Sequence, residues 1–239
     1  MKTQLQKLEY HVVNACNRSC EFCCHYSNFV QPAKLRSVEQ AREEWTPWAE
    51  RVQPAWFILL GGEPTLNKEL EGLAELAREI WTGAKIGLFT NGHRLEKFPR
   101  LPSLLDTLDF SLYDAKERAE MQAKVQPFRD AGVKVTFADF TRANWLEFYN
   151  LVDGKPQPWQ DNRPAEAWAN CSARYCHVLY ENKLWKCPQV AFHKTVDIDW
   201  EHFVGYKPCT LEDDPKEWAE RTYEDCCRHC PSDKIVHLG

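Results

Sequence analysis

The chain has 239 residues, 44% of them hydrophobic, which suits one medium domain or a domain with a small appendage. Its formal net charge of −5 excludes the basic field that attracts nucleic acid or anionic lipid. The longest apolar run, residues 55–60, is far shorter than the roughly 20 residues that span a bilayer, and the first ten residues contain no apolar stretch typical of a secretory signal. We expect a cytoplasmic protein that binds neither nucleic acid nor membrane.

The first half of the chain alternates predicted strands with predicted helices. In chain order, strands are predicted at residues 8–13, 56–60, 85–90, 108–113 and 133–140, and helices at residues 37–50, 68–81, 102–105 and 115–130. This alternation predicts right-handed βαβ units with a parallel sheet. Five units are too few for a closed eight-stranded barrel, which takes about 250 residues. The fold class that we expect is α/β, an open, partial (β/α) barrel.

Beyond about residue 150 the alternation stops. A proline-rich bridge leads into a tail that is rich in loops, tryptophan and cysteine, where residues 175–180 and 182–186 are suited to form a hairpin. We therefore divide the chain into a partial barrel, residues 1–150, and a small, loop-rich, cysteine-rich C-terminal domain, residues 151–239.

Cysteine is unusually frequent for a chain without an export signal. Four of the eleven cysteines lie between positions 16 and 24, and seven lie between positions 171 and 230. A disulfide framework is not expected in such a chain, and metal or redox chemistry is the usual reason for this density. The clustering predicts two metal-binding regions separated by a scaffold without metal.

The first cysteine group has the spacing CxxxCxxC, formed by Cys16, Cys20 and Cys23 directly after the first predicted strand. Three thiolates on one short loop can bind three corners of a [4Fe–4S] cluster, whereas ferredoxin clusters normally take four. The fourth iron is then open to a substrate or cofactor, as at other catalytic metal sites. A zinc site is the alternative, with Cys24 or His25 as its fourth ligand.

Two further motifs end neighbouring strands at the same expected rim. They are Gly61-Gly62-Glu63-Pro64 after the second strand and Thr90-Asn91-Gly92 after the third. CxxxCxxC followed by this GGEP sequence resembles the radical S-adenosylmethionine (SAM) superfamily, over about residues 8–140. Taken alone, each motif also has a structural explanation, such as glycines that permit a turn.

The resemblance implies roles for individual residues. Cys16, Cys20 and Cys23 would hold the cluster, and Phe22 would lie against the adenine of SAM. The residues that would contact the rest of SAM are Gly61, Gly62 and Glu63 at its methionine amino group, with Asn91 and Ser111 as further contacts. Phe22 as a core residue and Ser111 as an ordinary strand residue are the structural alternatives.

The resemblance also implies the chemistry. The reduced cluster would give one electron to SAM, and cleavage of a carbon–sulfur bond would leave methionine and a 5′-deoxyadenosyl radical. That radical abstracts hydrogen from an unactivated C–H bond, while the protein supplies position and excludes water. An external one-electron donor, such as a flavodoxin or ferredoxin, is the expected partner.

The second cysteine group ends in CxxC, a spacing that brings two thiolates to one metal. A structural zinc knuckle is one interpretation. Together with the first motif, however, the tail resembles a twitch domain, the shortened form of a SPASM domain, with Asn182 in place of a glycine; asparagine tolerates the left-handed conformation. The resemblance implies one auxiliary [4Fe–4S] cluster, with ligands Cys171, Cys187, Cys227 and Cys230; Cys226 could replace Cys227, and Cys176 could replace Cys171.

Short twitch proteins resemble aminocyclitol dehydrogenases and related sugar-modifying enzymes, in which the auxiliary cluster accepts the second electron of an alcohol oxidation. We expect no additional N-terminal domain of the kind that holds a precursor peptide, and therefore a small polar substrate, such as an aminocyclitol or sugar. Modification of a peptide by epimerisation or crosslinking is one alternative, and activation of a glycyl-radical enzyme is another. An epimerase needs a hydrogen-donating thiol, for which Cys209 is the candidate. A zinc-binding interaction protein is the non-enzymatic alternative.

Overall fold

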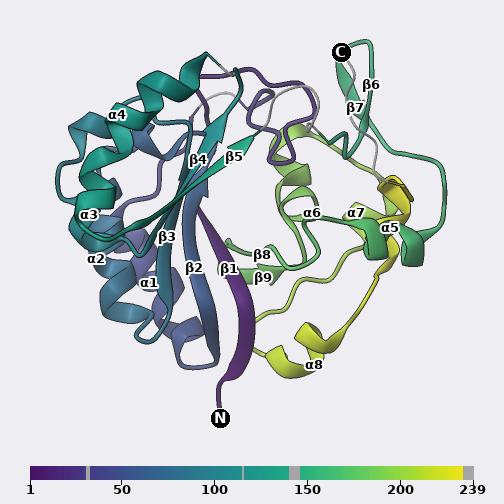
Figure 1. Ribbon diagram of the computed structural model, residues 1–239. Helices are drawn as coiled ribbons and strands as arrows, with labels where there is room; N and C mark the ends of the chain where they lie inside the picture. Colours follow the sequence, from purple (N-terminus) through teal and green to yellow (C-terminus); the bar gives the residue numbers. More distant parts are fainter. Residues whose placement is uncertain (31–32, 115, 140–145, 234–239) are drawn as a thin grey trace.

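The computed structural model describes residues 1–30, 33–114, 116–139 and 146–233. Within these residues, seven strands form one sheet in the order β5-β4-β3-β2-β1-β8-β9 (Figure 1). All neighbours from β5 to β8 are parallel, and only β9 is antiparallel to β8. The strands are β1 (Thr3–Val13), β2 (Val52–Gly61), β3 (Lys85–Thr90), β4 (Thr107–Leu112), β5 (Lys134–Asp139), β8 (His177–Tyr180) and β9 (Lys183–Trp185). The sheet is not closed, which confirms the partial barrel.

Four helices follow the first strands and cover one face of the sheet (Figure 1). They are α1 (Val38–Ala49), α2 (Leu70–Ile80), α3 (Leu101–Leu104) and α4 (Glu117–Asp130). Helix α1 begins with a reciprocal cap: the Gln40 N–H donates to the Ser37 hydroxyl, and the Ser37 N–H donates to the Gln40 side chain, both at 3.1 Å. Each of these strands and helices was expected from the sequence, with ends that differ by a few residues.

The pleat of β1 separates two environments. Leu8, Tyr10 and Val12 pack into the core under the helices, where Tyr10 meets Trp45 of α1 at 4.9 Å between ring centroids. The residues between them point to the opposite, inner face of the sheet, because successive strand side chains alternate. Glu9, at 3% exposure, is therefore buried on the inner face.

The C-terminal part lies on the other side of the sheet from α1 to α4 (Figure 1). The expected hairpin is present as β8 and β9, and β8 joins the sheet beside β1, with Leu8 opposite His177. The other elements are the hairpin β6 (Asn150–Val152) with β7 (Lys155–Gln157), and the helices α5 (Pro164–Asn170), α6 (Pro188–Phe192), α7 (Glu201–Val204) and α8 (Pro215–Glu220). Within the described residues, every helix is too short or too polar to cross a bilayer.

A second hydrophobic cluster joins this C-terminal part to the loop after β1. It contains Phe22 and Tyr26 from that loop, Tyr149, Val178 of β8, and Phe203 of α7. The loop with the first cysteine group is therefore fixed by residues from the far end of the chain. A division at residue 150 remains a prediction, because the two parts share one sheet and this cluster.

Candidate functional site

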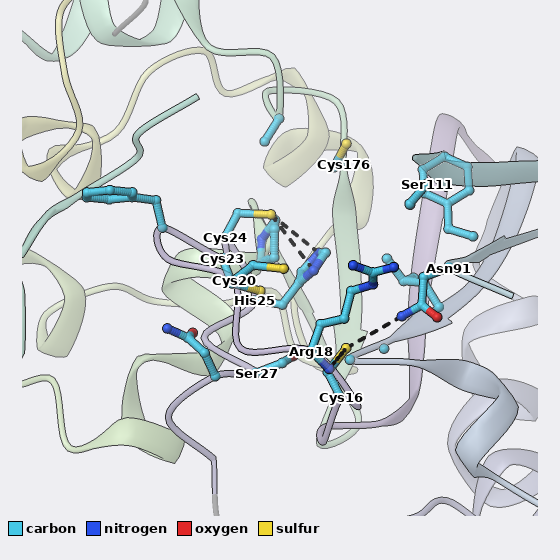
Figure 2. A pocket seen from close by; sticks show the side chains of 18 of the residues that line it. Cys16, Arg18, Cys20, Cys23, Cys24, His25, Ser27, Asn91, Ser111 and Cys176 are labelled. Atoms are coloured by element: carbon cyan, nitrogen blue, oxygen red, sulfur yellow. Dashed lines mark hydrogen bonds between the residues drawn. The ribbon is translucent and has the colours of Figure 1, made fainter. Parts of the chain in front are cut away.

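A cavity of about 360 Å³ opens where the parallel strands end. It is bordered by the loop after β1, by the ends of β2, β3 and β4, and by residues of the C-terminal part (Figure 2). The residues singled out in the sequence that line this cavity are Cys16, Cys20, Phe22, Cys23, Gly61, Gly62, Asn91 and Ser111. Three strand ends and one loop thus bring these residues to a single place.

The loop between β1 and α1 holds its cysteines in an unusual backbone conformation. Phe22 and Tyr26 have φ values of 56° and 55°, in the left-handed region that bulky residues rarely adopt. The Tyr26 N–H donates to the Cys23 carbonyl at 2.8 Å, and the Tyr149 hydroxyl donates to the same carbonyl at 3.4 Å. Because the Tyr26 side chain is fully buried, packing overcomes the backbone strain.

The two glycines after β2 lie against the start of this loop. The Gly62 N–H donates to the Val13 carbonyl, and the Glu63 N–H donates to the Ala15 carbonyl, both at 2.9 Å. A Cβ atom on Gly62 would lie 2.1 Å from the Ala15 carbonyl oxygen, and one on Gly61 would lie 2.2 Å from that of Val13. The close backbone approach therefore requires glycine at both positions.

Glu63 is the one expected SAM contact that does not line the cavity. Its side chain is completely buried. Its carboxylate accepts hydrogen bonds from the Thr65 hydroxyl at 2.7 Å, the Thr90 hydroxyl at 2.6 Å and the Asn91 N–H at 2.8 Å. Glu63 thus ties the end of β2 to the end of β3, below the cavity.

Asn91 in turn reaches the cysteine loop. Its side-chain amide donates to the Asn17 side chain at 2.9 Å and lies 3.8 Å from the Cys16 sulfur (Figure 2). The chain of contacts from Glu63 through Asn91 to Cys16 gives the first thiol a defined position.

The surroundings of the three thiols of the first group raise their pKa values and so favour the protonated form. Burial raises the pKa of Cys20 to about 11, and the neighbouring Cys23 and Cys16 thiols add to the rise. Burial is also the main reason why the pKa values of Cys16 and Cys23 are raised. Ionising several adjacent thiols requires a compensating cation, and metal ligation by thiolates releases these protons.

The second cysteine group surrounds a much smaller cavity, of about 30 Å³. The cysteines that line it are Cys24, Cys171, Cys187, Cys226, Cys227 and Cys230. All four expected auxiliary ligands are in this set. Cys24, from the first loop, lines both cavities. Within the described residues, no three Cys, His, Asp or Glu side chains converge on a point that one metal ion would occupy.

The remaining two cysteines differ in position. Cys209 is 1% exposed, exchanges two backbone hydrogen bonds of 2.9 Å with Leu184, and lines neither cavity. Cys176 lines the larger cavity, and its sulfur lies 3.7 Å from the Lys7 ammonium. Of these two thiols, Cys176 rather than Cys209 lines the candidate site.

Sequence reasoning missed several other residues that line the cavity. Arg18 extends into it (Figure 2), is paired with Glu117 of α4, and lies 4.5 Å above the ring of Tyr113. Lys7 and Glu9 enter from β1. The sequence could have indicated both residues, because two charged residues that alternate with apolar ones inside a buried strand must face a polar environment.

Comparisons with known proteins match this picture. The family described as the radical SAM superfamily matches residues 10–143. A GTP 3′,8-cyclase of Mannheimia succiniciproducens is 32% identical over 96 residues, 38% of this chain and 27% of that protein. A probable GTP 3′,8-cyclase of Pyrobaculum aerophilum is 33% identical over 100 residues, 40% of this chain and 30% of that protein. The chain therefore matches less than a third of the length of these relatives.

Among solved structures, that of BtrN in complex with AdoMet and 2-DOIA superposes with a TM-score of 0.57 and 17% identity. The superposition covers 96% of this chain and 94% of that one. At this identity the likeness shows a common fold that includes the C-terminal part.

Proposed function

The chain belongs to the radical SAM superfamily, and we propose that it abstracts hydrogen from a small polar substrate and oxidises it. Membership of this family implies a bound [4Fe–4S] cluster and SAM. When bound, these groups supply a 5′-deoxyadenosyl radical that can attack an unreactive C–H bond. The observation that carries the proposal is the single cavity that unites the CxxxCxxC thiols with the two strand-end motifs.

Cys16, Cys20 and Cys23 are the proposed ligands of the SAM-binding cluster. Their thiols line one cavity and their loop is held by backbone hydrogen bonds to Gly62 and Glu63, so the donor set fits the group. Three ligands leave one iron free for SAM.

The proposed SAM contacts are Phe22, Gly61, Gly62, Asn91 and Ser111, all at the cavity wall. The Phe22 ring, held 5.7 Å from that of Tyr149, offers an apolar surface suited to adenine. The two glycines let the loop and the strand end approach closely. For Glu63 we propose a positioning role, because its carboxylate is occupied by Thr65, Thr90 and Asn91.

Residues 151–239 are the proposed auxiliary-cluster domain. Cys171, Cys187, Cys227 and Cys230 surround one small cavity, which supports their assignment as ligands of a second [4Fe–4S] cluster. A cluster bound there would accept one electron from the substrate. Cys24 lines both cavities, so an electron route between the two proposed clusters would pass close to it.

A small polar substrate, similar to an aminocyclitol or sugar, is supported by the charged side chains that line the cavity. Sites for small molecules carry a few polar groups on an apolar wall. The fold shared with BtrN in complex with 2-DOIA supports the same class of substrate. An external one-electron donor of the flavodoxin or ferredoxin type is the proposed partner, since the reaction starts from a reduced cluster.

Epimerisation, including that of a peptide, is a second candidate outcome, favoured by Cys176. Burial raises the pKa of this thiol, which keeps it in the S–H form that can donate a hydrogen atom. The sulfur radical left behind would be reduced by one electron from the external donor and one proton.

The proposal is tested by iron analysis and electron paramagnetic resonance of anaerobically reconstituted protein. Wild-type protein should be brown and hold about eight iron atoms, as two [4Fe–4S] clusters require. Cys16→Ala, Cys20→Ala and Cys23→Ala should each hold about four. Cys209→Ala is the control, because this cysteine lines neither cavity. A colourless protein that holds zinc would contradict the proposal and favour a structural role.

A further inference from the structure

Lys7 and Glu9 form a charged pair on the inner wall of the larger cavity, and no role assigned above uses them. Both side chains leave β1 on its inner face and line the cavity, while Leu8 between them packs under the helices. Glu9 is only 3% exposed. A buried carboxylate at a cavity wall is costly unless a donor or a cation compensates it.

The groups that surround Glu9 compensate its buried negative charge only in part. The Lys7 ammonium lies 3.9 Å from the Glu9 carboxylate, beyond hydrogen-bond distance. The Cys176 thiol is its other partner, and a thiol is a weak donor. Within the described residues, no N–H or O–H group donates a hydrogen bond to this carboxylate, and burial raises its pKa.

Lys7 also has other neighbours. Its ammonium lies 3.7 Å from the Cys176 sulfur and 5.5 Å from the centre of the Phe89 ring. Asp109 on β4 also lies within reach of this charge: burial raises the pKa of the Asp109 carboxyl, and the charges of Lys7 and of the exposed Lys134 oppose the rise. Glu9 thus shares Lys7 with a second carboxylate, and among the described residues it is the carboxylate that lines the cavity.

We propose that Glu9 anchors an amino group of the substrate, so that the substrate is an amine-bearing polyol rather than a neutral or acidic one. This inference rests on the proposed function, and it names the substrate class of the same cavity. A substrate ammonium would bring both the missing hydrogen-bond donors and the missing positive charge, and charge-assisted hydrogen bonds are about twice as strong as neutral ones. An acidic polyol would place its own carboxylate against Glu9.

The test compares two probes that differ by one group, scyllo-inosamine and scyllo-inositol. For the reconstituted holoenzyme with SAM and reductant, the apparent KM of each probe is measured from the 5′-deoxyadenosine formed above the level without probe. Wild type should favour the amine by about tenfold or more. In Glu9→Gln the apparent KM for the amine should rise about tenfold to hundredfold, while that for inositol stays within about twofold.

Two variants separate recognition from folding. Glu9→Asp keeps the charge and should keep the preference for the amine, with a higher KM for both probes. Glu96→Gln removes an exposed carboxylate outside the cavity and should behave as wild type. A defect in folding would raise the apparent KM of both probes equally and would not alter the ratio of the two KM values.

Three outcomes overturn the inference. If Glu9→Gln keeps the preference of the wild type, Glu9 is not the anchor. If the wild type has the same apparent KM for both probes, the amine is not recognised, although the proposal of a polyol substrate is retained. If neither probe changes SAM cleavage in an enzyme that cleaves SAM, the proposed class of substrate is wrong, and the inference falls with it.

Discussion

Gly62 and Ala15 make the tightest backbone contact of the candidate site. A Cβ atom at Gly62 would lie 2.1 Å from the Ala15 carbonyl oxygen and 2.3 Å from its carbonyl carbon. The Ala15 carbonyl cannot rotate away from such a Cβ atom, because it belongs to the backbone. The position of the cysteine loop therefore depends on the absence of a side chain at Gly62.

Gly62→Ala should destabilise the fold by about 3 kcal/mol or more and lower the iron content, because the loop with Cys16 must move away from β2. Urea denaturation and iron analysis measure the two effects. Gly132→Ala is the matched control: Gly132 has φ +81°, but no atom lies within 4 Å of its added Cβ. It should cost about 1–2 kcal/mol of backbone strain and leave the iron content unchanged. Normal iron in Gly62→Ala would contradict the account.

The sequence predicted which residues line the site better than it predicted the contacts that hold those residues in place. Spacing was sufficient for the three cysteines and for the glycines, because these residues have a strong local signature. The partners of Glu63 come from Thr90 and Asn91, 27 and 28 residues away. Such a contact depends on how β2 and β3 pair, so no local pattern could predict these partners.

Among the helices and strands, too, the sequence predicted those with a local pattern and missed those that depend on distant contacts. Strands β1 to β5 and helices α1 to α4 were all expected, and only α3, with four residues, is as short as the helices of the C-terminal part. Helices α5 to α8 have four to seven residues, which is too short for a helical period to stand out. The parallel pairing of β8 with β1 joins residues about 170 positions apart, and nothing local specifies it.

The C-terminal cysteine group should be separable from the first one. Cys227→Ser and Cys230→Ser should each reduce the iron content by about four atoms. They should keep SAM cleavage and lose most substrate turnover, since the first cavity contains neither residue. Cys209→Ser, outside both cavities, should retain both activities and the full iron content. If Cys227→Ser lost SAM cleavage as completely as Cys20→Ala does, the two groups would not form separate sites.

The stability of the whole molecule should fall in mild acid because of buried histidines. His177 begins β8, and its ring lies 5.0 Å from that of Trp218. Burial, followed by the charge of Lys186, lowers the pKa of His177 from 6.5 to about 4. Between these two pH values the unfolded chain binds a proton at His177 that the folded protein does not. The free energy of unfolding therefore decreases as pH falls through this window.

His177→Gln should flatten this dependence between pH 6.5 and pH 4, as measured by urea denaturation at a series of pH values. His93→Gln on the exposed surface is the control and should leave the slope as in wild type. An identical acid slope in His177→Gln and wild type would show that other groups cause the loss of stability.

The central claim is that the cavity between the strand ends starts radical chemistry on SAM. It is tested most directly by reducing the reconstituted protein anaerobically in the presence of SAM and measuring 5′-deoxyadenosine by mass spectrometry. The account predicts that wild type and Cys209→Ala form this product and that Cys20→Ala does not. Wild-type protein that carries its full iron content and still forms no 5′-deoxyadenosine would contradict it.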